Sequence, residues 1–158
     1  MDETGQFGQN GIFFRSAEHE LMCRKAEVFG DKVNMLKIVE AQTPAQAKEI
    51  RRQVSPFDEN VWKIERYNAL YQTVLIKFQQ SKDLLKLLLE TGNRYIGEAA
   101  DYDPIFGIGL SKFNSSKSRG CKLETGEFDI PPEYWVGQNL LGIALMEVRF
   151  TLRNSNDS

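Results

Sequence analysis

The sequence predicts a single, predominantly helical domain. Its 158 residues suit one domain that is large enough to bury a hydrophobic core. Hydrophobic residues make up 41% and charged residues 27%, which is an ordinary globular composition. Five segments carry helical spacing or helix caps, and no internal repeat is present.

Start and stop signals define the predicted helices. Ser16 is a good N-cap and Gly30 a good helix end. Thr43 is followed by Pro44 at the first helical position and Gln46 at the third, which makes a capping box. The predicted helices cover residues 16–30, 43–54, 59–80, 83–90 and 138–152. Residues 94–99 favour a short strand.

The two ends of the chain differ in composition from its middle. Residues 1–11 are polar and rich in Gly and Gln, so we expect a flexible N-terminal segment without a secretion signal. The folded domain is predicted to span residues 12–153, and residues 154–158 to form a disordered tail. The last helix is apolar nearly all round, which predicts a central, buried position.

Composition excludes several kinds of site. No run reaches the roughly 18 apolar residues that a membrane span needs. With two Cys and one His, neither a disulfide scaffold nor a Cys/His zinc site is expected, so the sequence predicts a cytoplasmic protein without a metal. A net charge of −2 argues against a broad nucleic-acid surface, although Lys112, Lys117, Arg119 and Lys122 form a local basic cluster.

Charged residues interrupt the apolar face of the first helix. At 100° per residue, Glu18 and Lys25 share a face with Leu21, Met22 and Phe29. A carboxylate on an inward face is costly unless it is paired or used, so Glu18 is the first catalytic candidate. The opposite, polar face is expected to hold His19, Glu20, Cys23, Arg24 and Glu27. The alternative interpretations are a solvent-facing Glu18 at the helix start and a Lys25 whose stem covers apolar surface.

Other candidates lie further along the chain. Lys48, Arg51 and Arg52 make a basic group that suits a phosphate or a solvated face. In the loop 101–111, Asp103 could hold a ribose hydroxyl or orient water, and Phe106 could stack on a base. The alternative for its two Asp residues is turn formation.

Two further segments have competing interpretations. His19 and Cys23 are four residues apart, which suggests a nucleophile pair but lacks a third, orienting group. Trp135 is interpreted as core or as a stacking wall, and Asn139 as a helix cap or a ligand contact.

Several motifs, in this order, resemble the NADAR (YbiA-like) N-glycosidase family. The resemblance covers about residues 12–152 and rests on these segments: Ser16-Ala17-Glu18-His19, residues 25–31, residues 44–48, Phe57-Asp58 with Trp62 and Arg66, Lys77-Phe78, Thr91-Gly92, residues 98–109, residues 135–142 and residues 145–149. The chain departs from the family pattern at Arg51, where the family commonly has Gly, and at Phe106, where it commonly has Trp.

The resemblance implies a compact, mostly helical α+β domain of the YbiA-like kind that hydrolyses an N-glycosidic bond at a ribose C1′. The expected substrates are ADP-ribosylated guanine in nucleic acid or phosphoribosylated aminopyrimidine intermediates of riboflavin synthesis, and no cofactor is required. By analogy, Glu18 and Asp103 are the catalytic residues. The implied substrate-binding residues are Lys25, Arg52, Phe106, Gly107, Ile108, Gly109, Trp135 and Asn139.

Two other functions compete with this one. A non-catalytic module would bind ADP-ribose or a nucleotide and release no base. A structural helical adaptor would show no ligand-induced change in melting temperature.

Overall fold

The chain divides into two units, and the boundary between them along the sequence falls within one helix. The computed structural model describes residues 7–9, 12–99, 103–109, 133 and 135–156. One unit extends from Met1 to Leu87 and the other from Leu88 to Ser158, so the boundary lies within α5 (Lys82–Glu90). The predicted basic cluster at residues 112–122 lies outside the described residues, as do Asp101 and Tyr102.

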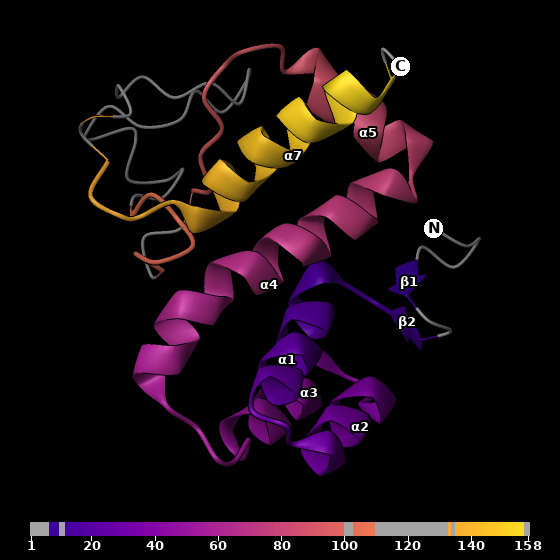
Figure 1. Ribbon diagram of the computed structural model, residues 1–158, viewed down its shortest axis with the longest axis vertical. Coiled ribbons are helices and arrows are strands. Elements are labelled where there is room, and N and C mark those ends of the chain that lie inside the picture. Colours follow the sequence, from indigo (N-terminus) through magenta and orange to yellow (C-terminus); the bar gives the residue numbers. More distant parts are fainter. Residues whose placement is uncertain (1–6, 10–11, 100–102, 110–132, 134, 157–158) are drawn as a thin grey trace. The chain divides into compact units, whose positions relative to one another are not determined.

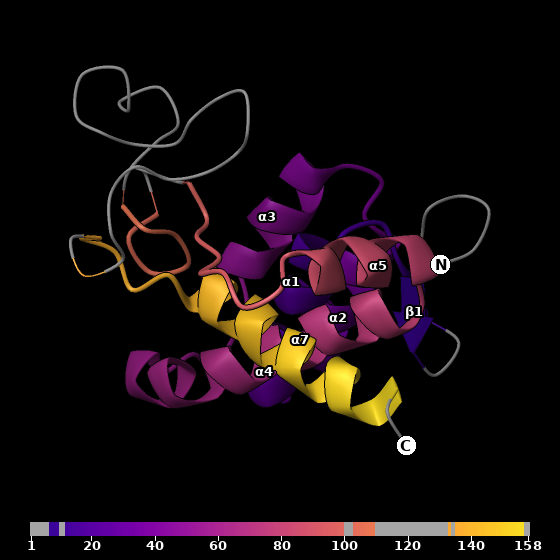
Figure 2. The same cartoon turned by 90° about the horizontal axis from the view of Figure 1, so that it is seen from above.

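The N-terminal unit joins a short hairpin to four helices (Figure 1). Strands β1 (Phe7–Gln9) and β2 (Ile12–Phe14) pair antiparallel, with Phe7 opposite Phe14. The helices are α1 (Ala17–Val28), α2 (Lys32–Glu40), α3 (Pro44–Arg52) and α4 (Glu59–Gln79). Helix α1 packs against the other three, and its position beside α2 and α3 can be followed in Figure 2.

Local sequence explains where these helices begin and end. The Ser16 hydroxyl accepts a hydrogen bond from the backbone N–H of His19 at 3.1 Å, and Thr43 accepts from Gln46 at 3.2 Å. Gly30 follows the last residues of α1 with φ +68°, a conformation that favours glycine. These caps confirm the predicted starts of α1 and α3.

Helix α2 has no counterpart among the predicted helices. Asp31 caps it by accepting from the N–H of Asn34 at 3.1 Å. Only Ile38 is fully buried on this helix, whereas Val33 and Leu36 are exposed. The apolar residues are therefore not confined to one face, so periodicity alone gives a weak signal.

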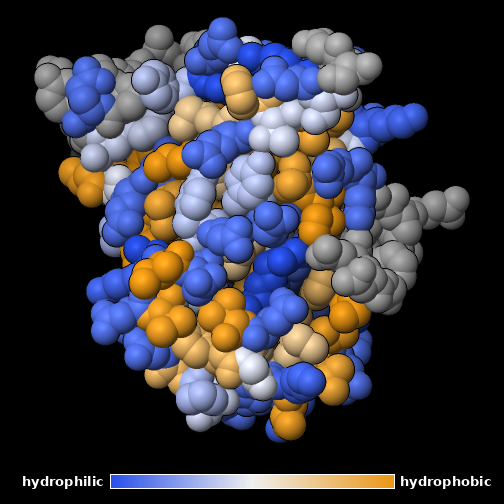
Figure 3. Space-filling view, in the orientation of Figure 1, coloured by the Kyte–Doolittle hydropathy of each residue, from blue (hydrophilic) through white to orange (hydrophobic). Residues whose placement is uncertain are grey.

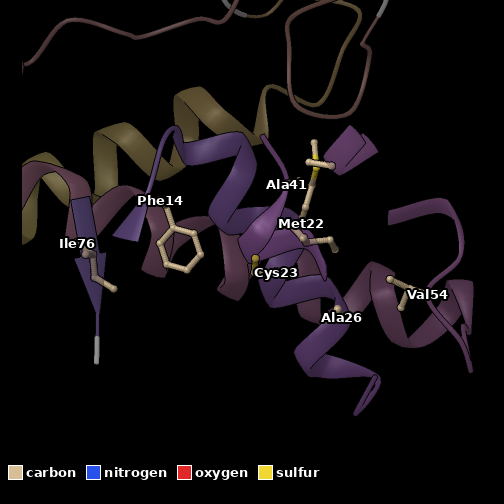
Figure 4. Close-up of a cluster of buried hydrophobic side chains, with 9 residues drawn as sticks. Phe14, Met22, Cys23, Ala26, Ala41, Val54 and Ile76 are labelled. Atoms are coloured by element: carbon tan, nitrogen blue, oxygen red, sulfur yellow. The ribbon is translucent and has the colours of Figure 1, made fainter. Parts of the chain in front are cut away.

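The core of the N-terminal unit is built from small and medium-sized side chains. Figure 4 shows it, with Met22, Cys23 and Ala26 following one another along α1. The cluster contains Phe14, Met22, Cys23, Ala26, Ile38, Ala41, Ala47, Val54 and Ile76. Ala26 and Ala47 are almost completely buried, which allows α1 and α3 to approach closely.

Apolar side chains also reach the surface of this unit. Val33 and Leu36 of α2 are exposed, as are Val61 and Ile64 of α4. The space-filling view shows such orange patches between blue, hydrophilic side chains (Figure 3). Among the described residues, no helix combines the length and the apolar character that crossing a membrane requires.

The C-terminal unit contains α7 (Leu140–Asn156) and, among the described residues before it, the irregular segments 94–99, 103–109 and 135–139. Ala144, Val148 and Leu152 bury one stripe of this helix, but Ile143 and Phe150 are exposed. The prediction of burial all round was therefore wrong, since only one stripe is covered. Helix α7 continues to Asn156, so residues 154–156, which were predicted to belong to a disordered tail, are helical.

Secondary structure is mostly helical, as predicted. The strand predicted at residues 94–99 is wrong, because this segment is irregular. Its backbone is instead held by side chains: Arg149 donates to the carbonyl of Arg94 at 2.8 Å, and Asn139 to that of Ile96 at 2.9 Å. The described strands are limited to β1 and β2, and the α+β class stays a prediction.

Candidate functional site

Glu18 lies in the first turn of α1 with its carboxylate at the surface. Its side chain is 55% exposed, and its Oε1 is 3.4 Å from the Nζ of Lys48 on α3. An exposed pair of this kind contributes about 0–1 kcal/mol to stability. Of the two interpretations of Glu18, the structure therefore shows the solvent-facing one and not the inward one.

A small hollow adjoins Glu18 between α1 and the start of α3. Its lining consists of Arg15, Ser16, Glu18, His19, Met22, Ala41, Thr43, Pro44 and Ala47. Its volume of about 30 Å³ has room for a water molecule or two, not for a nucleotide. The carboxylate thus borders a water-sized concavity.

His19 and Cys23 are buried, although the sequence placed them on the polar face of α1. The His19 Nδ1 accepts from the backbone N–H of Arg15 at 3.4 Å, and its Nε2 contacts the carbonyl of Ile38. In this network Nδ1 is the acceptor, and Nε2 faces the Ile38 carbonyl as the donor. Burial, together with the charges of Glu20 and Glu27, raises the pKa of the Cys23 thiol to about 12. A thiol that stays protonated is a poor nucleophile, so the pair is structural.

Lys25 lies two turns after Glu18 and contacts two aromatic rings. Its ammonium is 4.1 Å from the ring centroid of Phe57 and 5.6 Å from that of Trp62. Burial lowers the pKa of Lys25, the charge of Arg51 lowers it further, and Glu59 opposes the shift. Within the described part of the chain, Lys25 forms no ion pair. The arrangement therefore places a cation against two aromatic π-faces.

The loop that carries Phe57 is held by Asp31. The carboxylate accepts from the N–H of Ser55 at 2.9 Å and from the side-chain amide of Asn34 at 2.7 Å. These hydrogen bonds lower the pKa of Asp31. The peptide bond from Ser55 to Pro56 is cis. Phe57, which is 43% exposed, packs edge-on against Phe29 with ring centroids 5.1 Å apart.

Arg52 lies at the end of α3 with its guanidinium in solvent. Its side chain is 70% exposed and pairs with Glu49 at 3.3 Å, within the same helix. The neighbouring Arg51 is only partly exposed, and its charge acts on Lys25. Sequence reasoning named Arg51 and Arg52 together in one basic group and chose Arg52 as the substrate-binding residue, without separating the surroundings of the two. The signal it missed is helical phase, because Arg51 follows the buried Ala47 by one turn.

In the C-terminal unit, residues 103–109 and 135–139 form one hydrogen-bonded structure. The N–H of Gly137 donates to the carbonyl of Ile108 at 2.7 Å, and that of Asn139 to the carbonyl of Gly107 at 2.9 Å. Leu140 and Leu141, the first residues of α7, donate to the carbonyls of Ile105 and Phe106. The loop carbonyls therefore cap α7 and satisfy amides that would otherwise lack partners.

Glycine is required where these two backbones meet. A Cβ on Gly137 would lie 2.2 Å from the carbonyl oxygen of Gly107. Gly109 has φ +75°, and a Cβ there would lie 2.6 Å from the Val136 side chain. Ile108, between the two loop glycines, is 1% exposed. Residues 107–109, which the sequence predicted to bind ligand, are therefore held in place by the buried Ile108 and by close backbone contact with Gly137.

Asn139 and Asp103 both bind backbone groups. Asn139 has φ +52°; its Oδ1 accepts from the N–H of Glu98 at 3.0 Å and its Nδ2 donates to Ile96. The Oδ1 of Asp103 accepts from the N–H groups of Ile105 and Phe106 at 3.1 and 3.0 Å. One carboxylate oxygen of Asp103 forms the turn, as one interpretation predicted. This role is compatible with the other interpretation, in which Asp103 contacts a ribose hydroxyl or a water. Phe106 and Trp135 are partly exposed.

Metal chemistry has no obvious centre in the described ranges. They contain no group of three or more His, Cys, Asp and Glu side chains that could hold a metal ion. The candidate residues are instead carboxylates, cations and aromatic rings. In the N-terminal unit these are Glu18, Lys25, Arg51, Arg52, Phe57 and Trp62; in the C-terminal unit they are Asp103, Phe106 and Trp135.

The fold is mostly helical, and its candidate residues are carboxylates, cations and aromatic rings. A family model, the NADAR domain, matches residues 2–153. The chain therefore belongs to the NADAR family, as its motifs predicted.

Two curated relatives and one solved structure are similar to this chain. N-glycosidase R617 of Acanthamoeba polyphaga mimivirus is 35% identical over 142 residues, covering 90% of this chain and 76% of the viral protein. Protein irg-1 of Caenorhabditis elegans is 30% identical over 138 residues, covering 86% of this chain and 59% of the worm protein. The NMR structure of the E. coli protein YbiA matches with a TM-score of 0.71 at 23% identity, over 97% of this chain and 76% of the other, which shows the YbiA-like fold.

Proposed function

We propose that this chain is an N-glycosidase that hydrolyses the bond between a ribose C1′ and a nitrogen of a base. The observation that carries the proposal is the NADAR match over nearly the whole chain, supported by a relative that is named an N-glycosidase. The proposed substrates carry phosphate on the ribose: ADP-ribosylated guanine in nucleic acid, or a phosphoribosylated aminopyrimidine.

Glu18 is the proposed catalytic carboxylate. Breaking a ribosyl C–N bond develops positive charge on the sugar, and a nearby carboxylate stabilises that charge or takes a proton from the attacking water. The water oxygen bonds to C1′, and the electrons of the C1′–N bond pass to the base, which takes up a proton. An exposed Glu18 beside a water-sized hollow supports this role.

The remaining proposed residues bind the substrate. Lys25 of α1 and Arg52 of α3 attract the phosphate, and aromatic rings hold the base. In the C-terminal unit, Asp103 is proposed as a second catalytic group through the oxygen that does not form the turn. Gly107, Ile108, Gly109, Phe106, Trp135 and Asn139 complete the proposed set, the last one by shaping the backbone.

The test measures base release from both substrate classes. Glu18→Gln should fold normally and lose about 10²- to 10⁴-fold of the rate, because one positioned acid–base group contributes on that scale. Glu40→Gln is the control, since Glu40 is an exposed carboxylate of the same unit that contributes no proposed site group. No base released from either substrate class, or full activity of Glu18→Gln, would contradict the proposal.

A second function, ligand binding without hydrolysis, is favoured by one observation. The cluster of Lys25, Phe57 and Trp62 holds a cation against two rings and does not involve Glu18. A pure binding module would therefore bind ADP-ribose and leave every conjugate intact. Measuring ADP-ribose affinity alongside base release separates the two functions.

A further inference from the structure

A second hollow of the N-terminal unit, the hairpin hollow, is lined by residues of β2, α1 and α2. Its volume is about 130 Å³, and it shares no lining residue with the hollow beside Glu18. Glu20, which lines it, follows Glu18 by two residues, or about 200° around the helix axis. The two carboxylates therefore project on different sides of α1.

The Glu20 carboxylate is buried in this hollow with only one of its oxygens paired. The side chain is 2% exposed, and its Oε1 accepts from the Nε and Nη2 of Arg24 at 2.9 and 2.7 Å. The Oε2 atom is buried and has no hydrogen-bond partner among the described residues. A buried carboxylate oxygen without a donor is costly, and such groups are paired in most folded proteins. Oε2 is therefore the atom of the hollow that gains most from a donor.

The remaining walls are mainly apolar. Strand β2 and helix α2 supply four apolar side chains, Ile12, Phe14, Met35 and Val39. Phe14 also belongs to the buried cluster drawn in Figure 4. A buried water needs two to four polar partners, whereas an apolar cavity of roughly 150 Å³ accepts a benzene ring. The size and lining of the hollow thus suit one ring with a polar head better than a group of waters.

The charges around the hollow favour a cation. Two carboxylates, Glu20 and Glu27, and one guanidinium, Arg24, line it from successive turns of α1. Glu27 is exposed, so the hollow extends from the buried Glu20 to the surface. Cys23 also lines it, but no group of three or more His, Cys, Asp and Glu within the described ranges could hold a metal ion. An organic cation therefore fits these residues better than a metal.

We propose that the hairpin hollow binds a small organic cation, namely one aromatic ring that carries a protonated amidine or amine. An N–H group of the ligand donates to Oε2 of Glu20, and a charge-assisted hydrogen bond of this kind is strong. The ring packs between Phe14 on β2 and Met35 on α2. This inference goes beyond the proposed function, because none of these residues belongs to the set proposed for hydrolysis.

The experiment uses benzamidine as the probe and benzamide as its neutral, similarly shaped control, both on the full chain. Calorimetry measures the two affinities, and NMR detects contacts between the ring protons of the ligand and the methyl group of Met35. Benzamidine should bind at least about 10-fold more tightly than benzamide, because only the amidinium is charged. Its ring protons should show nuclear Overhauser effects to the Met35 methyl.

Three variants locate the site. Glu20→Gln should weaken benzamidine binding by about 10- to 100-fold and change benzamide binding little, because hydrogen bonds to charged groups contribute on that scale. Val39→Phe leaves the carboxylate in place and fills the hollow from α2, so both ligands should lose binding. Glu40→Gln, which removes an exposed carboxylate outside the hollow, should leave both affinities unchanged. Circular dichroism and the melting temperature show whether each variant is folded.

Four outcomes would overturn the inference. They are an absence of saturable benzamidine binding, which would mean that the hollow holds water only, equal affinities for benzamidine and benzamide, unchanged benzamidine binding by a folded Glu20→Gln, and unchanged binding by Val39→Phe. If Glu20→Gln does not fold, Val39→Phe and the Met35 contacts decide. Base release is not measured here, so a failure of the hydrolase proposal leaves this result unaffected.

Discussion

Glu20 places a carboxylate in the interior of the N-terminal unit. Its side chain is 2% exposed, and its Oε1 accepts from the Nε and Nη2 of Arg24 at 2.9 and 2.7 Å. The other oxygen has no hydrogen-bond partner among the described residues. Burial raises the pKa of Glu20 above its ordinary value of 4.5, and Arg24 acts in the opposite direction.

This raised pKa predicts a pH-dependent stability. Because the folded state holds the proton more tightly than the unfolded state, the stability associated with Glu20 is present below pH 4.5 and is lost as the pH rises through the folded-state pKa. Glu20→Gln removes the titration. Its free energy of unfolding should therefore improve relative to wild type as the pH rises from 4 to about 7, measured by urea unfolding.

Glu40→Gln serves as the comparison, since Glu40 is exposed. Parallel pH profiles for wild type and Glu20→Gln would show that Glu20 does not titrate with a raised pKa.

At single residues, sequence spacing predicted the caps better than the faces. Ser16 and Thr43 cap their helices as predicted, because capping depends on backbone atoms only a few residues away. The faces of α1 were assigned from polarity alone. Glu20, His19 and Cys23 are buried nevertheless, since Arg24 and nearby backbone groups supply partners that a helical projection does not contain.

At the scale of elements, the shape of the backbone determines how the 103–109 loop packs against the start of α7. The first two N–H groups of α7 donate to the carbonyls of Ile105 and Phe106, and Gly137 packs against the Gly107 carbonyl. The sequence predicted Gly107 and Gly109 as close-approach residues for a ligand. The structure shows close approach at Gly109, and the nearest neighbours there belong to residues 136 and 137 of the same chain.

Substituting Gly137 tests this contact. Gly137→Ala should lower the free energy of unfolding by about 3 kcal/mol or more, because its Cβ would lie 2.2 Å from a backbone oxygen that cannot move alone. Gly92→Ala is the matched control. It has φ +62° but no atom within 4 Å of the added Cβ, so only the backbone cost of about 1–2 kcal/mol remains. Equal losses in chemical denaturation would refute a steric role for Gly137.

For the whole molecule, ligand binding is measurable separately from hydrolysis. ADP-ribose should raise the melting temperature, because a ligand at 100 times its Kd stabilises the folded state by about 2.7 kcal/mol. Differential scanning fluorimetry with and without ADP-ribose measures the shift, and adenosine is the phosphate-free control. An unchanged melting temperature at millimolar ADP-ribose would favour a structural adaptor instead.

The candidate residues are distributed over both units of the chain. Glu18 and Lys25 belong to the N-terminal unit, whereas Asp103, Phe106 and Trp135 belong to the C-terminal unit. The ordered motifs nevertheless identified the family correctly, because a family is recognised by residue types in order along the chain. The role of each residue in the site is still a prediction.

The sequence by itself determined the mostly helical character, the bounds of α1, α3 and α4 to within about two residues, and membership of the NADAR family. These properties depend on caps, spacing and motif order, which are local. Only the tertiary structure decided that Glu18 is exposed, that Glu20 is buried, and that Lys25 lies against the rings of Phe57 and Trp62. Burial and charge proximity arise from the packing of α1 against α3 and the following loop, and such contacts between distant residues leave no periodic signal in the sequence.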